Sequence, residues 1–394
     1  MSAALTSGQT NDQPITAGKA CRVHQFGGPE VIRFEAQETL QPGEGEVLVR
    51  VKAAGVGPWD GWIRAGKSAF PQPLPLTLGS DLSGVVEAVG PNVTSIERGD
   101  AVFGVTNPRF TGSYADYAIA TAAMIARKPP SISDVDAASV PVIAVTAWQA
   151  LFEQAAALRG QSVLIHGAAG NVGAFAVQFA RQAGIRVVAT CAQQDLPFVR
   201  GLGAEEVLTR EGAPFESLVH DVDAVIDLVG GDVQTRSFAV LKSGGALISA
   251  VSQPDQAFAA ARGVKATFFL VNVTTERLQA IARMMETGSL VTAVGTVLPL
   301  SEARTAHEMP AQAARQDRLA CYRTILNRSC GDPNSARKSS PPFRPGEKPL
   351  PRWCACSRFT APPYLASSPK PELTRKRPRR LRVRFMEDSA MTPP

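Results

Sequence analysis

The segment VLIHGAAGNVG, residues 163–173, constrains the fold of this chain more than any other. Apolar residues run directly into a glycine-rich turn, and apolar residues at helical spacing then continue to Gly184. A buried strand that enters a helix through a tight turn is typical of the first unit of a βαβ fold. RVVATC at 186–191 supplies the next buried strand. The pattern predicts a parallel sheet flanked by helices.

Further strands and helices alternate after this unit. We expect a short helix at 195–203, strands at 205–209, 224–230 and 245–251, and an amphipathic helix at 274–290. Before it, Val-rich segments separated by Gly and Pro predict a β-rich domain, such as a partly open barrel. These strands are expected at 46–56, 83–90, 100–105 and 114–121, followed by a helix at 134–158. The fold class is therefore α/β with an additional β-rich domain.

The turn is suited to a dinucleotide. Ala168, Gly170 and Gly173 fill an A-x-G-x-x-G frame, in which Gly170 lets the backbone approach a pyrophosphate and Gly173 lets the helix pack on the strand. The helix that begins near Asn171 and Val172 offers unpaired N–H groups and a positive dipole end. The alternative is an ordinary tight turn, which also uses small residues.

The end of the second strand favours NADPH over NADH. An NAD site needs an acid there for the ribose hydroxyls, but Cys191 is followed by Ala-Gln-Gln. We expect Asp195 to be a helix N-cap instead. Gln193 and Gln194 could donate hydrogen bonds to a 2′-phosphate, although no Lys or Arg occurs before Arg200.

Several ordered motifs resemble the medium-chain dehydrogenase/reductase superfamily, and most closely its zinc-free quinone oxidoreductase and enoyl-reductase-like branch. The motifs are CRVHQFGGPEVIRF (21–34), AAGVGPWDGWIRAG (53–66), LGSDLSGVVEAVG (78–90), GSYADYA (112–118), VTAWQAL (145–151), LIHGAAGNVG (164–173) and LGAEEVL (202–208). The resemblance implies a GroES-like catalytic domain at 21–140 with a returning segment at about 291–315, and a Rossmann-type domain at 141–290. It places the active site in the cleft between them. It also implies further cofactor contacts from Thr146, Val229, Gly230 and Val251, and a homodimer.

The zinc ligands of the superfamily's alcohol dehydrogenases are missing. By the resemblance, the first Cys would fall at Gly57 and the His at Ser80. Neither residue supplies the thiolate or imidazole that zinc needs, and Asp60 and Asp81 alone make a poor zinc site. We therefore expect no metal. Zinc-free relatives often have Asn at the position of Gly57, so a hydrogen-bond donor is also lost here.

Reduction of an electron-poor carbon is the chemistry that remains. A quinone or an α,β-unsaturated carbonyl accepts hydride at carbon, and the protein supplies orientation and field. Candidate substrate-site residues are Trp59, Asp60, Arg64 and Tyr114. Trp59 could stack on a planar ring or anchor a loop, Asp60 could orient Arg64 or form a surface pair with it, and Tyr114 could donate to an oxyanion or pack in the core. Solvent is the expected proton source.

His166 ends the first strand of the Rossmann-type domain. We favour a structural role in which it hydrogen-bonds nearby backbone, with catalysis as the alternative.

The two ends of the chain differ from its body. Residues 1–20 are polar and lack a secretory signal, and we expect them to form a mobile leader. No apolar run reaches the roughly 18 residues that span a bilayer, so a cytoplasmic location is expected. Residues 310–394 contain 18 Lys and Arg against 6 Asp and Glu, a net charge of +12, whereas residues 1–309 contain 23 against 29, a net charge of −6. The tail also holds four of the six cysteines.

We interpret residues 316–394 as a disordered, Pro-rich basic tail that arises from a reading-frame shift. One permitted coding of residues 315–321, read without its first base, gives Gly-Lys-Ile-Val-Leu-Arg, which resembles the strand that closes the catalytic domain of relatives. Its loss would uncover a sheet edge.

The alternative function is a non-catalytic NADPH-binding sensor or scaffold whose RKRPRRLRVR segment (375–384) binds nucleic acid. Nucleic-acid binding is the less favoured interpretation, because no aromatic residues are interleaved for base stacking.

Overall fold

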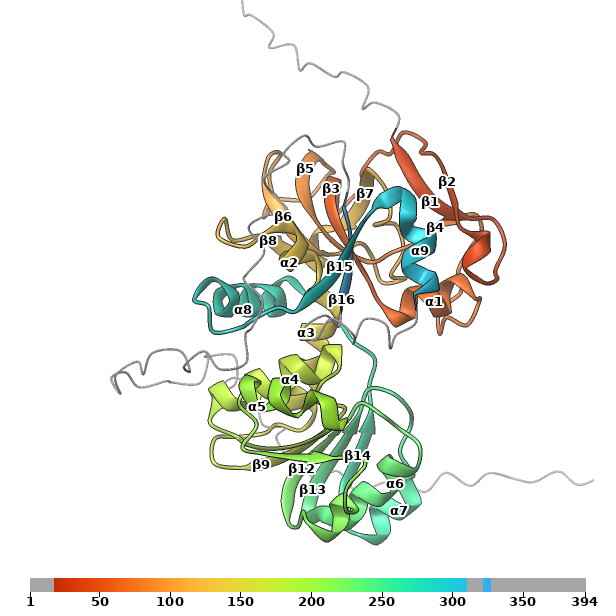
Figure 1. The fold of residues 1–394 in the computed structure, drawn as a ribbon. Coiled ribbons are helices and arrows are strands. Elements are labelled where there is room, and N and C mark those ends of the chain that lie inside the picture. The colour runs from red at the N-terminus through yellow and green to blue at the C-terminus, as the bar shows by residue number, and fades with distance from the viewer. Residues whose placement is uncertain (1–17, 310–321, 327–394) are drawn as a thin grey trace, which may run out of the picture. The chain divides into compact units, whose positions relative to one another are not determined.

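The computed structural model describes residues 18–309 and 322–326 (Figure 1). Within these residues no helix is long and apolar enough to cross a membrane. The fold class predicted from the sequence is confirmed: one part is a parallel sheet flanked by helices, and the other is a mainly antiparallel β structure. Residues 1–17 of the expected leader at 1–20 and most of the expected tail lie outside the described residues. Lys19 and Ala20 belong to β1, so the interpretation as a mobile leader is wrong for these two residues.

Six strands form the parallel sheet in the order β11-β10-β9-β12-β13-β14. Their bounds are β9 Ser162–His166, β10 Arg186–Cys191, β11 Glu206–Thr209, β12 Val222–Asp227, β13 Leu241–Ser249 and β14 Lys265–Phe268. Successive strands are added outward from β9 on one side and from β12 on the other, so the strand order reverses between β9 and β12. Ligands of open α/β sheets bind at such a switch point, beyond the carboxyl ends of the strands.

Alternating side chains of β9 enter two different cores, which is why its sequence is apolar throughout. Val163 and Ile165 belong to the cluster that contains Phe175 and Phe179 of α4 (Asn171–Ala183). Leu164 belongs to a second cluster with Phe238. Helices α5 (Leu196–Leu202), α6 (Asp232–Ser237) and α7 (Gln256–Ala261) complete the cover of the sheet (Figure 1).

The β-rich part contains a seven-stranded and a three-stranded sheet. The larger sheet runs β15-β16-β3-β5-β6-β8, with β7 also paired to β3, and the smaller one runs β2-β1-β4. The bounds are β1 Lys19–Val23, β2 Arg33–Ala36, β3 Glu46–Val56, β4 Leu76–Thr77, β5 Asp81–Val89, β6 Ala101–Val105, β7 Tyr117–Thr121, β8 Ile125–Arg127, β15 Val294–Pro299 and β16 Tyr322–Leu326. The helices associated with it are α1 Pro58–Arg64, α2 Asp134–Ala138, α8 Thr275–Glu286 and α9 Ala303–Glu308.

The sheet edge that we expected to lose its closing strand is covered. β16 pairs antiparallel with β3 and parallel with β15. Residues 322–326 therefore supply a strand within the segment interpreted as a disordered tail, and that interpretation is wrong for these five residues. β15 lies inside the expected returning segment at 291–315. The proposed limits at 140 and 290, and the frame shift itself, stay predictions.

The expected helix at 134–158 is divided. α2 ends at Ala138, and α3 (Pro141–Trp148) begins at a proline and continues as a π-helical turn through Gln154. Proline lacks the N–H that a helix interior requires, so Pro141 fits only the first turn of a new helix.

Candidate functional site

The glycine turn is fixed by two close approaches of the backbone. Gly167 adopts a left-handed conformation with φ of 71° directly after β9, which glycine tolerates without steric cost. A Cβ on Gly173 would lie 2.3 Å from the carbonyl oxygen of Gly167 and 2.7 Å from Cα of Ala168. Gly173 is therefore required by packing, as predicted. Gly167 precedes the predicted frame and was missed, although a glycine directly after a buried strand was a signal for it.

The first turn of α4 is available to a ligand. Gly170 is its N-cap, and no side chain caps the N–H groups of this turn. A Cβ on Gly170 would approach the Gly167 oxygen to 3.1 Å, a tighter fit than most side chains accept. The small residues thus form a cradle that added side chains would fill, and this fits a pyrophosphate held by backbone N–H groups.

Three strand ends meet at the turn. Val229 and Gly230 follow β12, and Val251 follows β13; the valine side chains are about half exposed, at 50% and 48%. A Cβ on Gly167 would lie 3.2 Å from Val229, and one on Gly230 would lie 3.2 Å from Val251. The structure therefore brings these predicted residues beside the turn, where their apolar surface faces solvent.

Asp227 holds this arrangement together and was not predicted. Its carboxylate is buried at the end of β12. Oδ1 accepts hydrogen bonds from the N–H groups of Val229 at 3.0 Å and Gly230 at 2.8 Å. Oδ2 accepts from Gln234 Nε2 and Ser249 Oγ, each at 2.8 Å. One carboxylate thus sets the path of the chain between β12 and α6.

His166 makes side-chain rather than backbone hydrogen bonds. Its ring nitrogens lie 2.9 Å from Thr190 Oγ1 and 3.0 Å from Ser237 Oγ. Burial lowers its pKa to about 4. The expected structural role fits this position, but the expected partners were wrong.

An ion pair between Arg210 and Glu211, which follow the neighbouring strand β11, lies at the end of β10, where the cofactor ribose is predicted to bind. Gln193 is exposed, and its N–H donates to Glu211 Oε2 at 3.1 Å. Arg210 donates from Nε to Glu211 Oε1 at 2.8 Å, and its backbone N–H bonds the carbonyl of Cys191 at 3.0 Å. A basic side chain, which is absent from the residues directly after β10, is therefore supplied by Arg210 after β11. Asp195 does precede α5 as its N-cap residue, but its side chain makes no capping bond.

Thr146 lies on α3, which packs against α4. It is buried, and its hydroxyl donates to the carbonyl of Val142 at 2.7 Å. Its predicted contact with the cofactor stays a prediction.

The substrate-site candidates come together around α1, but with partners other than those expected. Asp60 is fully buried, and its Oδ2 accepts from Gly57 N–H at 2.8 Å and from Tyr114 Oη at 3.0 Å. Burial raises the pKa of Asp60 above its usual range, and it also raises that of Tyr114. Asp60 forms neither of the two pairings with Arg64 that we considered, because it faces the core.

Arg64 instead links α1 to α9. Its Nε donates to the carbonyl of Gly27 at 3.2 Å, and its Nη1 lies 2.7 Å from His307 Nδ1. Since guanidinium groups only donate, Nδ1 of His307 is the acceptor. Burial lowers the pKa of Arg64.

Trp59 lies between the two positions at which the resemblance places zinc ligands. Its indole Nε1 donates to Ser80 Oγ at 2.9 Å, and its ring covers Gly57. Ser80 Oγ in turn donates to Asp81 Oδ2 at 3.3 Å. No group of three or more His, Cys, Asp or Glu side chains suited to a metal occurs among the residues described. Metal independence itself stays a prediction.

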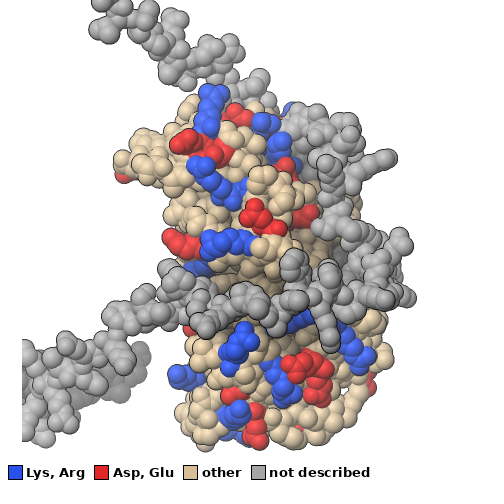
Figure 2. Space-filling model, turned by 90° about the vertical axis from the view of Figure 1, so that its left-hand side faces the viewer, with Lys and Arg blue, Asp and Glu red and all other residues tan. Residues whose placement is uncertain are grey.

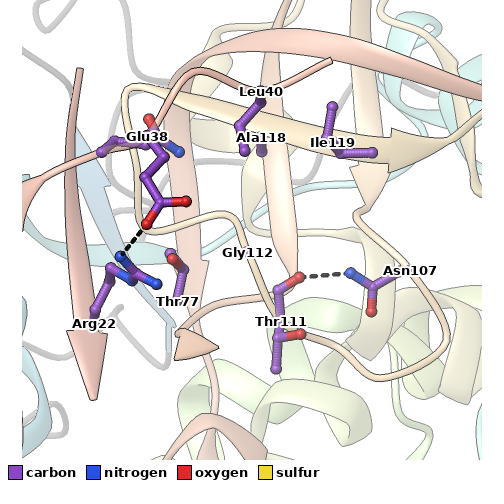
Figure 3. A pocket seen from close by; sticks show the side chains of 10 residues that line it. Arg22, Glu38, Leu40, Thr77, Asn107, Thr111, Gly112, Ala118 and Ile119 are labelled. Atoms are coloured by element: carbon purple, nitrogen blue, oxygen red, sulfur yellow. Dashed lines mark hydrogen bonds and ion pairs between the residues drawn. The ribbon is translucent and has the colours of Figure 1, made fainter. Parts of the chain in front are cut away.

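A cavity of about 210 Å³ opens on the β-rich part (Figure 3), and no residue of the glycine turn lines it. Arg22 and Glu38 form an ion pair at 3.8 Å on one side, and Asn107 donates to the carbonyl of Thr111 on another. None of the predicted site residues lines it.

Two sequence families match the chain. The "Alcohol dehydrogenase GroES-like domain" family matches residues 43–130, and the family described as "Zinc-binding dehydrogenase" matches residues 202–316. Human quinone oxidoreductase is 31% identical over 307 residues, which cover 74% of this chain and 93% of the relative. The family name does not establish a bound metal in this chain.

Solved structures give the same result. The quinone oxidoreductase from Coxiella burnetii is 31% identical with a TM-score of 0.72, and the match covers 79% of this chain and 99% of that one. A mycobacterial protein, Rv1454c, solved in complex with NADPH, is 31% identical with a TM-score of 0.68 and coverage of 78% and 99%. The chain therefore belongs to the medium-chain dehydrogenase/reductase superfamily, among NAD(P)H-dependent oxidoreductases related to quinone oxidoreductases.

Proposed function

We propose that the protein is a metal-independent, NADPH-dependent reductase that transfers hydride to a quinone or an α,β-unsaturated carbonyl. The observation that carries this proposal is the occupation of the zinc-ligand positions by Gly57 and Ser80, with the Trp59 indole between them. Similarity to quinone oxidoreductases supports the reaction class.

Each part of the site has a defined task in this reaction. The turn from Gly167 to Gly173 binds the pyrophosphate, and Asp227 orients the Val229–Gly230 segment beside it. When bound, the reduced nicotinamide supplies the hydride. Hydride addition leaves negative charge on the acceptor oxygen, which must then take up a proton. Asp60 and Tyr114 are buried and bonded to each other, so we assign proton delivery to water.

A panel assay tests the reaction class. We expect NADPH to be consumed with 1,4-quinones and with enones, and slow turnover or none with secondary alcohols and NADP⁺. Activity should survive dialysis against a strong chelator, with well under one zinc per chain by metal analysis. Exclusive alcohol oxidation, or stoichiometric zinc with activity lost on chelation, would overturn the proposal.

The alternative of a non-catalytic nucleic-acid-binding scaffold has less support. Its basic segment at 375–384 lies outside the described residues. On the face shown in Figure 2, basic and acidic side chains of the described residues are intermixed, whereas nucleic-acid binding favours a patch of one sign. Steady NADPH consumption with a quinone would separate the two functions.

A further inference from the structure

Gln178 is the only polar side chain among the buried residues of α4, a helix that the structure describes in full. Its amide nitrogen Nε2 donates to the carbonyls of Ala174 and Val291, each at 3.1 Å. Its Oε1 accepts from the N–H of Val291 at 2.8 Å. The side chain therefore satisfies both backbone polar groups of Val291, as the facing residue of an antiparallel strand would.

Val291 lies between α8 and β15 and belongs to neither, so its backbone has no partner within a helix or sheet. The residue before it, Leu290, is buried in the apolar cluster that also contains Phe179 of α4. The residue after it, Thr292, donates from Oγ1 to Asp136 Oδ1 of α2 at 2.5 Å. Three successive residues, 290–292, therefore contact α4 on one side and α2 on the other.

These contacts connect the cofactor turn to the β-rich part of the molecule. Gln178 lies about 10 Å beyond Asn171 along α4, the helix whose first turn faces the glycine turn. At the other side of the connection, α2 packs against β3 and β5. α3 also packs against α4, but apolar packing is non-directional, whereas hydrogen bonds weaken steeply when they are misaligned. The bonds of Val291 and Thr292 therefore fix the register between α4 and α2.

We propose that Gln178 is a positioning residue, which transmits the placement of α4 and of a cofactor bound to it through residues 290–292 to the β-rich part. Its role in the reaction rests on the proposed function. Hydride passes efficiently only when the reacting atoms are about 3–3.5 Å apart. The glycine turn belongs to α4, whereas the predicted substrate residues lie around α1 in the other part. Loosening the connection should therefore slow hydride transfer without weakening the grip of the turn on the cofactor.

Hydrogen exchange with and without NADPH tests the connection in the absence of turnover. In the wild type, saturating NADPH should slow backbone exchange at 163–176 and also at 289–299, the latter by at least about threefold. Gln178→Met keeps a similar length but cannot donate a hydrogen bond. In this variant the slowing at 163–176 should persist and that at 289–299 should disappear. Equal slowing at 289–299 in both proteins would overturn the proposal, whereas a merely structural role would speed exchange without removing the response to NADPH.

Single-turnover kinetics test the consequence for the reaction, because they separate cofactor binding from hydride transfer. The rate of NADPH oxidation by a 1,4-quinone should fall about tenfold in Gln178→Met, with the dissociation constant of NADPH within about twofold of the wild-type value. Thr292→Val removes the next bond of the same connection and should have a similar effect. Because the two bonds act in series, the double variant should be no slower than the slower single variant. Multiplicative rate losses would show that the two residues act separately and would contradict the connection.

Gln182 provides the matched control on the same helix. Its Nε2 donates to the carbonyl of Ser289 at an exposed position, where water can replace the bond. Gln182→Met should therefore keep the wild-type exchange response and rate, and losses equal to those of Gln178→Met would mean that α4 is loosened in general and that Gln178 has no special role. A wild-type protein that reduces neither quinones nor enones would instead overturn the proposed function, while the exchange comparison would still decide whether Gln178 transmits cofactor binding.

Discussion

Gly173 is the residue whose replacement tests the cofactor turn most directly. An Ala side chain there must displace the backbone of Gly167 or Ala168, and such overpacking costs about 1–3 kcal/mol. We expect Gly173→Ala to weaken NADPH binding severely, and Gly173→Asp to abolish it by adding negative charge near the phosphates. Gly170→Ala, whose Cβ approach is the longer 3.1 Å, should be milder. Fluorescence titration with NADPH measures this, and equal affinities in all variants would refute the site.

Arg210 and Glu211 are expected to set the preference between the two cofactors. The guanidinium attracts a 2′-phosphate, and the carboxylate repels it while accepting from a free ribose. Arg210→Ala should lower the ratio of NADPH to NADH affinity, and Glu211→Gln should raise it, each by several-fold. Arg200→Ala on α5 is the control. If neither substitution changes the ratio of dissociation constants, the 2′-phosphate is recognised elsewhere.

Residues of the site were predictable where their role follows from local sequence, and missed where it depends on a distant partner. The small residues at 168–173 follow one strand and precede one helix, so spacing sufficed. Arg210 reaches the end of β10, where the ribose is predicted to bind, because β11 lies beside β10, and sequence order does not show this pairing. Asp60 was expected either to orient Arg64 or to form a surface pair with it, but burial of Asp60 decides its partners.

At the scale of elements, Asp227 joins the end of β12 to the turns that follow β12 and β13. The Asp227 carboxylate only accepts hydrogen bonds, whereas the amide introduced by Asp227→Asn would turn its NH₂ group toward N–H and O–H groups that also donate. Hydrogen bonds to a charged group contribute about 1.5–3 kcal/mol each. We expect lower stability and a raised dissociation constant for NADPH, measured by urea unfolding and fluorescence titration.

Asp223 is the matched control for this prediction. It lies at the other end of β12, accepts from Ser162 N–H at 2.8 Å and pairs with Lys242 at 2.9 Å. Asp223→Asn should reduce stability without changing NADPH affinity. If Asp223→Asn weakens NADPH binding as much as Asp227→Asn does, the effect is global and Asp227 has no special positioning role.

Elements with a strong apolar pattern were predictable almost to the residue, and those fixed by pairing were not. β3 and β10 match their predicted bounds, β9 ends at His166 as predicted, and α4 ends one residue before Gly184. β14 was missed because Lys265–Phe268 is short and carries no clear alternation. β16 gains its structure from pairing with β3 and β15, which composition alone could not indicate.

For the whole molecule, the change from short separated strands to alternating strands and helices was enough to predict two architectures. Composition gave the number of ionisable groups, but not which of them are buried. His166 and Asp60 are both inside, and burial shifts the pKa of each; a pKa that differs between the folded and unfolded states makes stability depend on pH.

His166 should make the folded protein sensitive to mild acid. Burial is the main cause of its lowered pKa of about 4; the charge of Arg236 adds to the effect, and that of Asp227 opposes it. Above the unfolded value of about 6.5 both states are neutral and stability is complete. Below it the unfolded chain binds a proton that the folded protein excludes, so stability falls by about 1.4 kcal/mol per pH unit, or roughly 3 kcal/mol by pH 4.

Comparison with a variant isolates this contribution, because the raised pKa of Asp60 acts in the opposite direction in acid. His166→Gln keeps hydrogen-bonding capacity toward Thr190 and Ser237 but cannot titrate. The free energy of unfolding in urea should fall between pH 7 and pH 5 by about 2 kcal/mol more in the wild type than in His166→Gln. His220→Gln, at an exposed histidine, should behave as the wild type does. An equal loss in the wild type and His166→Gln would show that the buried ring does not exclude its proton, and the acid sensitivity would then have to come from other groups.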